Sequence, residues 1–328
     1  FSIHNTLDQK VFQFNDNLSI VKDVHNINVG LSFEKFQFGN SFNLGFLGGA
    51  GVFFPSYGSV SDFLADAALG TSSNIYAQLQ AATAIAEGAD NAGEGVAGGW
   101  NYYKINVGQA AVFAQDEISF KDNFKMTFGF RFDKPLYFNS SELAQDFIDT
   151  QCCYDPTIPY TDPETGETYY FDSTQMPSSK SIFSPRLGFN WDVNRDKSLQ
   201  VRGGTGIFTG RFPFVWIGNQ NGAPNSWFYE VIDPDFEWPR VWKTSLGIDK
   251  KLNGNAVATF DISYADDQKS AHVQNWGLST PTGELQGVDN RPIYTSADKG
   301  NSAYVLTNSD KGYAFNISGK LQKTFANG

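Results

Sequence analysis

Few residues of this 328-residue chain have the types and spacing that catalysis requires. His4, His25 and His272 are too scattered to indicate a ligand set, and the sequence contains no GxSxG elbow, HExxH helix or P-loop. The stretch GGTGIFTG at 203–210 lacks the GxGxxG spacing and is not followed by GKS or GKT, so it does not indicate a nucleotide site. We therefore predict that the chain is not an enzyme and holds no cofactor.

Metal binding has one weak candidate, in the acidic stretch YTDPETGETYYFDST. Asp162, Glu164 and Glu167 supply carboxylate oxygens, which are the ligands that Ca²⁺ prefers. Their spacing does not match an EF-hand loop, and a solvated acidic loop is the simpler interpretation, so we predict no metal site. Cys152 and Cys153 are adjacent, which leaves either two thiols or a strained disulfide between neighbours.

Ligand recognition is better represented, in a segment at 211–240 that is dense in aromatic and amide side chains. Such side chains combine stacking surfaces with neutral hydrogen-bonding groups, as needed to hold sugars, peptides or chelates. The alternative is that these aromatics form a small core of the loop itself, or a girdle at a membrane surface. The candidate contact residues for a substrate or partner are Trp216, Asn219, Gln220, Asn221, Asn225, Trp227, Phe228 and Tyr229.

The elements that must position these residues show a strict two-residue alternation. In MTFGFRFDKP (126–135) Met and Phe alternate with Thr, Gly, Arg and Asp. In PRLGFNWDVNRDKSLQVRGG (185–204) two alternating runs flank the turn NRDK. A period of two is typical of strands with one apolar and one polar face, and the turn indicates a hairpin.

The cations of the polar face are expected to point into a water-filled interior. Their expected partners are Asp192, Asp249 or Asp261, or a plug inside a barrel, because charges within a membrane protein pair with one another. The residues predicted to face the lumen are Arg131, Arg186, Arg202 and Lys243.

Short polar turns alternate with long irregular segments along the chain. The turns VKDVH, KDNF, NRDK and LNGN each join two alternating runs, giving about nine strands of roughly 9 to 14 residues, the length that a tilted strand needs to cross a bilayer. At Glu34–Lys35 the apolar residues shift from one set of alternate positions to the other, which predicts a bulge or an aromatic rim at the membrane surface. A helix is expected near 75–86, ended by the glycines after it. The long loops are predicted at about 39–106, 136–180, 210–239 and 266–311.

Composition agrees with a barrel that crosses a membrane with strands. The net charge of -11 argues against nucleic-acid binding, and no apolar run is long enough for a membrane-spanning helix. In a membrane barrel only alternate residues face lipid, so hydropathy stays low, and 30 Phe, 14 Tyr and 32 Gly fit such strands. The predicted fold class is therefore an all-β, antiparallel up-and-down transmembrane barrel segment over 1–328, with long loops on the extracellular side and no plug domain in this chain.

Three stretches resemble the barrel of TonB-dependent outer-membrane receptors, in particular the Oar-like or SusC-like groups: SPRLGFNWDVNRDKSLQVRGGTGIFTGRFPFVWI, DPDFEWPRVWKTSLGIDKKL and AYVLTNSDKGYAFNISGKLQKTF. The resemblance implies a 22-stranded barrel in the outer membrane of a Gram-negative bacterium, closed by a plug. Because the chain lacks an initiator Met and its strand count is odd, we expect it to be an interior piece of such a barrel.

The function that the resemblance implies is substrate import, coupled to the TonB complex through N-terminal parts outside this chain. Partners would be the lipid bilayer and a surface lipoprotein or other outer-membrane subunits. Two alternatives remain open at this point. One is a barrel subunit of a larger outer-membrane assembly for protein export or surface display, and the other is a passive porin.

Overall fold

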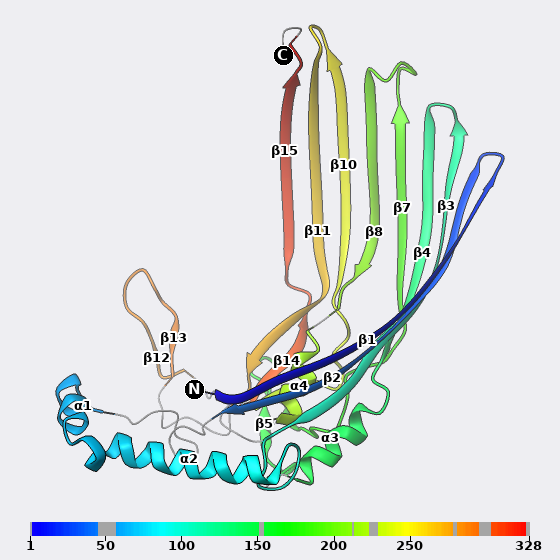
Figure 1. Ribbon diagram of the computed structural model, residues 1–328. Helices are drawn as coiled ribbons and strands as arrows, with labels where there is room; N and C mark the ends of the chain where they lie inside the picture. The colour runs from blue at the N-terminus through cyan, green and yellow to red at the C-terminus, as the bar shows by residue number, and fades with distance from the viewer. Residues whose placement is uncertain are drawn as a thin grey trace.

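Nine long strands form one sheet in the computed structural model, which describes residues 2–44, 57–150, 154–211, 213–222, 229–277, 281–294 and 303–325 (Figure 1). Each strand is antiparallel to its neighbour, in the order β1-β2-β3-β4-β7-β8-β10-β11-β15. The predicted all-β, up-and-down fold class is thus confirmed. The bounds are β1 Ser2–Lys22, β2 His25–Leu44, β3 Tyr103–Lys121, β4 Phe124–Leu136, β7 Ile182–Asp192, β8 Leu199–Thr209, β10 Arg240–Leu252, β11 Ala256–Asn275 and β15 Tyr313–Lys323.

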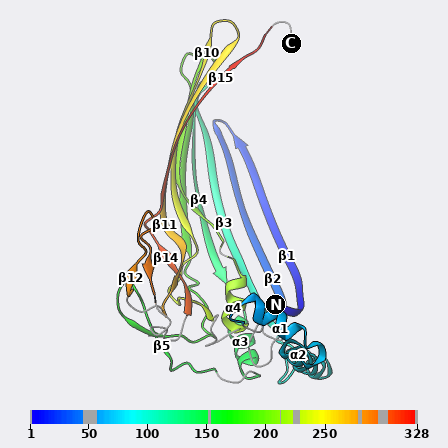
Figure 2. The same cartoon turned by 90° about the vertical axis from the view of Figure 1, so that its left-hand side faces the viewer.

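The other elements gather at one end of the sheet, opposite the short turns (Figures 1 and 2). β14 extends the sheet by pairing antiparallel with β11, and β9 pairs parallel with β14. We call these connecting segments, together with their helices, the loop body; its described residues are 57–102, 137–150, 154–181, 210–211, 213–222, 229–239, 276–277, 281–294 and 303–312. Its elements are α1 Val60–Ala67, η1 Gly70–Ser72, α2 Asn74–Ala92, α3 Ser140–Ile148, α4 Val215–Gly222, β5 Pro159–Thr161, β6 Thr168–Tyr170, β9 Tyr229–Ile232, β12 Gly283–Glu284, β13 Pro292–Ile293 and β14 Ala303–Ser309.

Turn chemistry explains why the hairpins close at these positions. Asp23 has a φ of 53°, and Gly254 and Asn255 have φ of 73° and 57°. These are left-handed conformations that Gly, Asn and Asp adopt at the lowest cost, and tight hairpins require them. The polar turn residues of the sequence therefore reverse the chain where the alternating runs stop.

Several strands are longer than the sequence pattern indicated. β1, β2, β3 and β11 have 21, 20, 19 and 20 residues, whereas about 9 to 11 residues suffice to cross a bilayer. β2 continues to Leu44 and β11 continues past Ala265 to Asn275, inside segments expected to be loops. The extra length brings these strands into the loop body.

The two faces of the sheet differ sharply in chemistry. On β4, Phe130 is 44% exposed, while the carboxylate-bearing Asp133 on the other side is 1% exposed. We call the side that holds Arg131, Asp133 and Arg202 the inner face. Since large aromatics in water would be costly, the outer face with its exposed Phe side chains is suited to lipid.

The phase change near Glu34 is not a bulge. The β1–β2 and β2–β3 ladders run without a shift through Glu34 and Lys35. Instead, Phe36 and Phe38 lie on the inner face, where they pack against Phe214 of the loop body. The inner face is polar along the strands and becomes apolar where the loop body covers it.

The helical part of the first long loop also differs from expectation. α2 begins at Asn74, with the side chain of Ser73 accepting a hydrogen bond from the Tyr76 amide at 3.1 Å. It runs through Gly88 to Ala92 and is capped by Gly93, whose φ of 100° favours glycine. The predicted helix was therefore too short. Among the described residues, no helix has both the length and the apolar character to cross a bilayer.

The core of the molecule lies within the loop body rather than along the sheet. One buried cluster surrounds Trp238, whose Nε1 donates to Tyr137 Oη at 3.1 Å. A second cluster surrounds Tyr229 and Trp276. These clusters hold the connecting segments against the ends of β3 and β11 as a packed layer.

Candidate functional site

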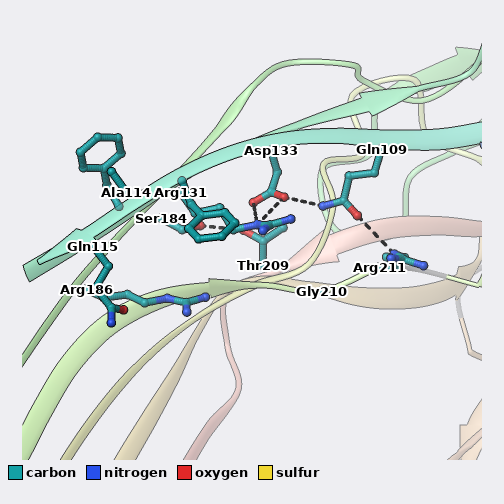
Figure 3. Close-up of a pocket in the computed structure, with 13 residues that line it drawn as sticks. Gln109, Ala114, Gln115, Arg131, Asp133, Ser184, Arg186, Thr209, Gly210 and Arg211 are labelled. Atoms are coloured by element: carbon teal, nitrogen blue, oxygen red, sulfur yellow. Dashed lines mark hydrogen bonds and ion pairs between the residues drawn. The ribbon is translucent and has the colours of Figure 1, made fainter. Parts of the chain in front are cut away.

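A hollow of about 540 Å³ opens on the inner face, between β3, β4, β7 and the segment that follows β8 (Figure 3). Three arginines, Arg131, Arg186 and Arg211, line it together with Asp133 and Gln109. Gln109, Arg131, Asp133 and Arg186 belong to the alternate set of strand residues that faces inward. The hollow is thus a polar, mainly cationic space.

Asp133 is the centre of a hydrogen-bond network in this hollow. Its Oδ1 accepts from Arg131 Nε at 2.8 Å and from Gln109 Nε2 at 2.5 Å. Arg131 also reaches Ser32 Oγ of β2 at 3.3 Å. Because a buried carboxylate is costly unless it is paired, these donors are what allow Asp133 to be 1% exposed.

Arg211 extends the network across the concave side of the sheet. Its Nε donates to Gln109 Oε1 at 3.2 Å, and its Nη2 pairs with Glu34 of β2. Its guanidinium lies 5.3 Å from the centre of the Phe36 ring. Glu34 in turn accepts from Gln13 of β1 at 2.5 Å. Arg211 therefore ties the segment after β8 to β2, with β3, β4 and β7 between them in the sheet.

A second ion cluster lies farther along the inner face, toward the short turns. Arg202 on β8 donates to Asp249 of β10 at 2.5 Å and to Asp261 of β11 at 2.6 Å. Thr259 Oγ1 adds a hydrogen bond to Asp249 at 2.6 Å. Of the three carboxylates expected as partners, the structure pairs Arg202 with two.

Arg186 and Lys243 are placed differently from Arg131 and Arg202. The Arg186 guanidinium lies 4.7 Å from the centre of the Phe208 ring, and the Lys243 ammonium lies 5.9 Å from it. Both are on the inner face, because they pair across the ladders with Gly206 between them. All four cations predicted to face the lumen thus lie on one side of the sheet. Whether that side encloses a lumen stays a prediction.

The aromatic and amide segment at 211–240 is used largely for packing. Gln220 is fully buried, and its amide donates to the carbonyls of Ser173 and Gln175 and accepts from the Ile232 amide, at 2.8, 3.0 and 2.9 Å. Tyr229 is also fully buried and shares a hydrogen bond of 2.7 Å with Ser173. For these two residues the structure corresponds to the alternative interpretation, in which the segment forms its own core.

The remaining candidates of that segment are only partly accessible or lie outside the described residues. Trp216 packs against the Trp238 cluster, and Asn219 donates to Glu230. Burial raises the pKa of Glu230 above its ordinary value, and the hydrogen bond from Asn219 partly offsets this. The side chain of Asn221 is not described, and Asn225, Trp227 and Phe228 lie outside the described residues, as do Cys152 and Cys153.

The weak metal candidate is dispersed into separate contacts. Glu164 accepts from Lys311 and Gln274, each at 3.0 Å, and Glu167 accepts from Tyr169 Oη at 3.1 Å. Asp162 accepts from the Glu164 amide at 2.7 Å, as turns commonly do. Within the described ranges, no three His, Cys, Asp or Glu residues are grouped closely enough to hold a metal ion.

Sequence reasoning missed Glu34, Gln109 and Asp133 as members of the inner-face network. Their positions within the alternating runs could have indicated that they face inward. The contacts that they make could not have been found from the sequence, because Glu34 and its partner Arg211, for example, are 177 residues apart.

The comparison with protein families decides the class of this sheet. The model of the outer membrane beta barrel domain matches residues 2–227, which is more than half of the chain. The chain belongs to this family. As an outer membrane beta barrel domain it is located in the bacterial outer membrane, and the prediction of a membrane barrel with lipid as its surroundings is confirmed.

Solved structures of outer-membrane proteins are similar to this barrel domain. They include the transporter YddB from Escherichia coli (12% identity, TM-score 0.47, covering 96% of this chain and 30% of that one) and the FrpB iron transporter from Neisseria meningitidis (12%, 0.46, 96% and 33%). A third is the ferric enterobactin receptor PfeA from Pseudomonas aeruginosa (12%, 0.47, 96% and 33%). The barrel domain thus spans about a third of their length.

These three solved proteins are described as transporters and a receptor, not as enzymes. No curated protein matches the chain. Assignment to an Oar-like or SusC-like group stays a prediction.

Proposed function

We propose that this barrel domain is part of a TonB-dependent receptor that imports a substrate across the outer membrane. The observation behind the proposal is the inner-face hollow with its paired and unpaired cations, next to a packed loop body at one end of the strands. A passage for a polar substrate needs such a face, because polar groups that line it replace part of the substrate's hydration. The resemblance of the strand sequences to TonB-dependent barrels agrees with this.

In this proposal the two parts of the chain have separate tasks. The loop body lies on the extracellular side and captures the substrate, and the polar inner face conducts it once a plug moves. The long strands β2, β3 and β11 link the two, because each runs from the short-turn end into the loop body. The 22-stranded barrel, the plug, the contact with TonB and a surface lipoprotein partner belong to the proposal.

The test begins with native mass spectrometry of the protein purified in detergent from its own membrane. We expect a bound small molecule, and uptake of that molecule by cells should stop when a protonophore abolishes the proton gradient. A matched culture treated with the solvent alone is the control. Uptake that continues at the same rate without the gradient would reject TonB-coupled import and favour a passive porin.

A second candidate function is favoured by the arm formed by α1 and α2. α1 has no buried residue, and Val60, Leu64 and Leu79 are 74%, 59% and 48% exposed. Exposed apolar side chains grouped on one arm are typical of a surface that a protein partner covers. On this basis the barrel domain would be a subunit of an outer-membrane assembly for protein export or surface display.

Co-purification separates this candidate from import. Under the assembly function, a partner protein should stay bound in detergent, and Leu64→Ser should release it. Val288→Ser is the matched control, because Val288 is also exposed but lies near the separate β12–β13 hairpin. Retention of the partner by Leu64→Ser would remove the arm from consideration.

A further inference from the structure

Two cations share one aromatic ring on the inner face. Arg186 of β7 and Lys243 of β10 are both within 6 Å of the centre of the Phe208 ring, at 4.7 and 5.9 Å. They come from strands on either side of β8, to which Phe208 belongs. Two like charges beside one ring repel each other, and an anion bound between them would offset that repulsion.

The ladder explains how the two side chains come to lie together. Arg186 and Lys243 are both register partners of Gly206. An added Cβ at Gly206 would lie 2.9 Å from the carbonyl oxygen of Pro185 and 3.1 Å from Arg186 Cγ. The glycine therefore leaves the space that the Arg186 side chain needs next to β8.

Other arginines of the inner face have carboxylate partners. Arg131 pairs with Asp133, Arg202 with Asp249 and Asp261, and Arg211 with Glu34. Arg186 and Lys243 form no ion pair within the described part of the chain. In a protein with a net charge of -11, carboxylates are plentiful, and among the described residues this pair of cations nevertheless has no carboxylate partner.

The surroundings leave room for a ligand. The next inner-face row beside Gly206 consists of Gly188, Gly204 and Ser245, all of them small. Arg186 and Lys243 are exposed, and Arg186 lines the hollow of about 540 Å³ (Figure 3). Arg186 thus borders open space, and the Lys243 side chain is accessible to solvent.

We propose that Arg186, Lys243 and Phe208 bind an anionic small molecule that has carboxylate or phosphate groups. This inference rests on the proposed transport function and names the class of its substrate. The planar Arg186 guanidinium donates hydrogen bonds to two oxygens of one anionic group, and Lys243 neutralises a second oxygen or group. Phe208 holds both cations in place, and its ring offers a surface for the ligand's carbon frame.

The experiment is isothermal titration calorimetry on the purified detergent-solubilised protein, with citrate and inorganic phosphate as separate probes. The test variant is the double substitution Arg186→Gln with Lys243→Gln. The control is Lys320→Gln, because Lys320 of β15 is exposed on the same face, opposite Thr259, but lies away from Phe208. Side chains exposed to solvent in this way can be changed without disturbing the fold.

We expect at least one anion to bind the parent protein, and the double variant to bind it at least tenfold more weakly, with Lys320→Gln unchanged. Whichever probe binds identifies carboxylate or phosphate as the recognised group. Arg186→Lys should lose part of the affinity, because lysine keeps the charge and lacks the fork. No binding of either probe to the parent, or equal binding by the double variant, would overturn the proposal.

Failure of this site and failure of the transport function give different results. Equilibrium binding in detergent needs no proton gradient, so it tests only the anion site. Anion binding that persists while uptake proves independent of the gradient would reject TonB-coupled import alone. Gradient-dependent uptake by a protein whose double variant binds citrate and phosphate normally would reject the anion site alone.

Discussion

At the scale of single residues, the side of the sheet decides what a side chain does. Phe130 and Arg131 are neighbours in sequence, yet the first is exposed on the outer face and the second donates to a buried carboxylate. In the same way, Phe189 belongs to the outer face of β7 and Arg186 to its inner face. Substitutions at adjacent positions should therefore have opposite consequences.

Placing a charge on the outer face should destabilise the barrel. Phe130→Arg and Phe189→Arg are each expected to reduce the free energy of unfolding by about 2 to 4 kcal/mol if they lie near the bilayer centre. Thr127→Arg should cost much less, because Thr127 pairs with Glu117 on the inner face. Equilibrium unfolding in liposomes measures all three, and equal costs would show that the strand faces are assigned incorrectly.

The raised pKa of Glu230 predicts a pH dependence. Because burial raises the pKa above its ordinary 4.5, the folded state holds the proton more tightly than the unfolded state does. The associated stability is fully present below pH 4.5 and is lost as the pH rises through the folded-state pKa. Glu230→Gln should therefore melt at a higher temperature than the parent near pH 7, with the difference vanishing in acid.

Thermal unfolding followed by tryptophan fluorescence at several pH values checks this. Gln retains the oxygen that accepts from Asn219, so the comparison isolates the charge. A constant difference across the pH range would mean that Glu230 does not titrate as expected.

At the scale of elements, the inner face needs glycines where strands carry large paired side chains. An added Cβ at Gly247 would lie 2.6 Å from Arg202 Cζ and against the Asp261 carboxylate. Gly319 on β15, by contrast, has nothing within 4 Å of such a Cβ. The ion cluster around Arg202 thus has room because Gly247 of β10 carries no side chain.

Gly247→Ala should consequently cost about 1 to 3 kcal/mol, as overpacking typically does. The methyl group would force Arg202 away from its two carboxylates. Gly319→Ala is the matched control and should change stability little. Unfolding by guanidinium in detergent gives both values, and a neutral Gly247→Ala would show that the cluster adapts without cost.

At the scale of the whole molecule, the loop body and the sheet are stabilised by different means. The strands are joined by backbone ladders and inner-face polar networks, while the loop body has buried clusters around Trp238 and Tyr229. Arg211, Phe36 and the extended ends of β2 and β11 connect the two parts. Damage to one part should therefore be separable from damage to the other.

Trp238→Ala should loosen the loop body and leave the strands paired. Removing a fully buried Trp costs about 3 to 5 kcal/mol, and here it also removes the hydrogen bond to Tyr137. We expect limited proteolysis to cut within the loop body much faster than in the parent, with unchanged β-signal in circular dichroism. Loss of the β-signal would mean that the sheet depends on this core.

Much of the fold could be predicted because alternation is a local property. The period of two around Phe130 and in the Leu187–Trp191 run predicted the strands and the sides of their residues, and the polar turns predicted the hairpins. The same two-residue alternation predicted that Arg186 and Lys243 lie on the inner face. The length of the helix ending at Ala92 was underestimated because a single glycine, Gly88, is tolerated inside a helix.

The sequence by itself determined which strand residues share a face, where the hairpin turns lie and the polar or apolar chemistry of those faces, since these depend on residues a few positions apart. Only the tertiary structure decided that Gln220 and Tyr229 are buried, that Phe36 turns toward the loop body, and that Arg211 reaches Glu34. Those contacts join residues far apart in the chain. They form because the curvature of the sheet and the packing of its loops bring distant side chains together, which no local pattern records.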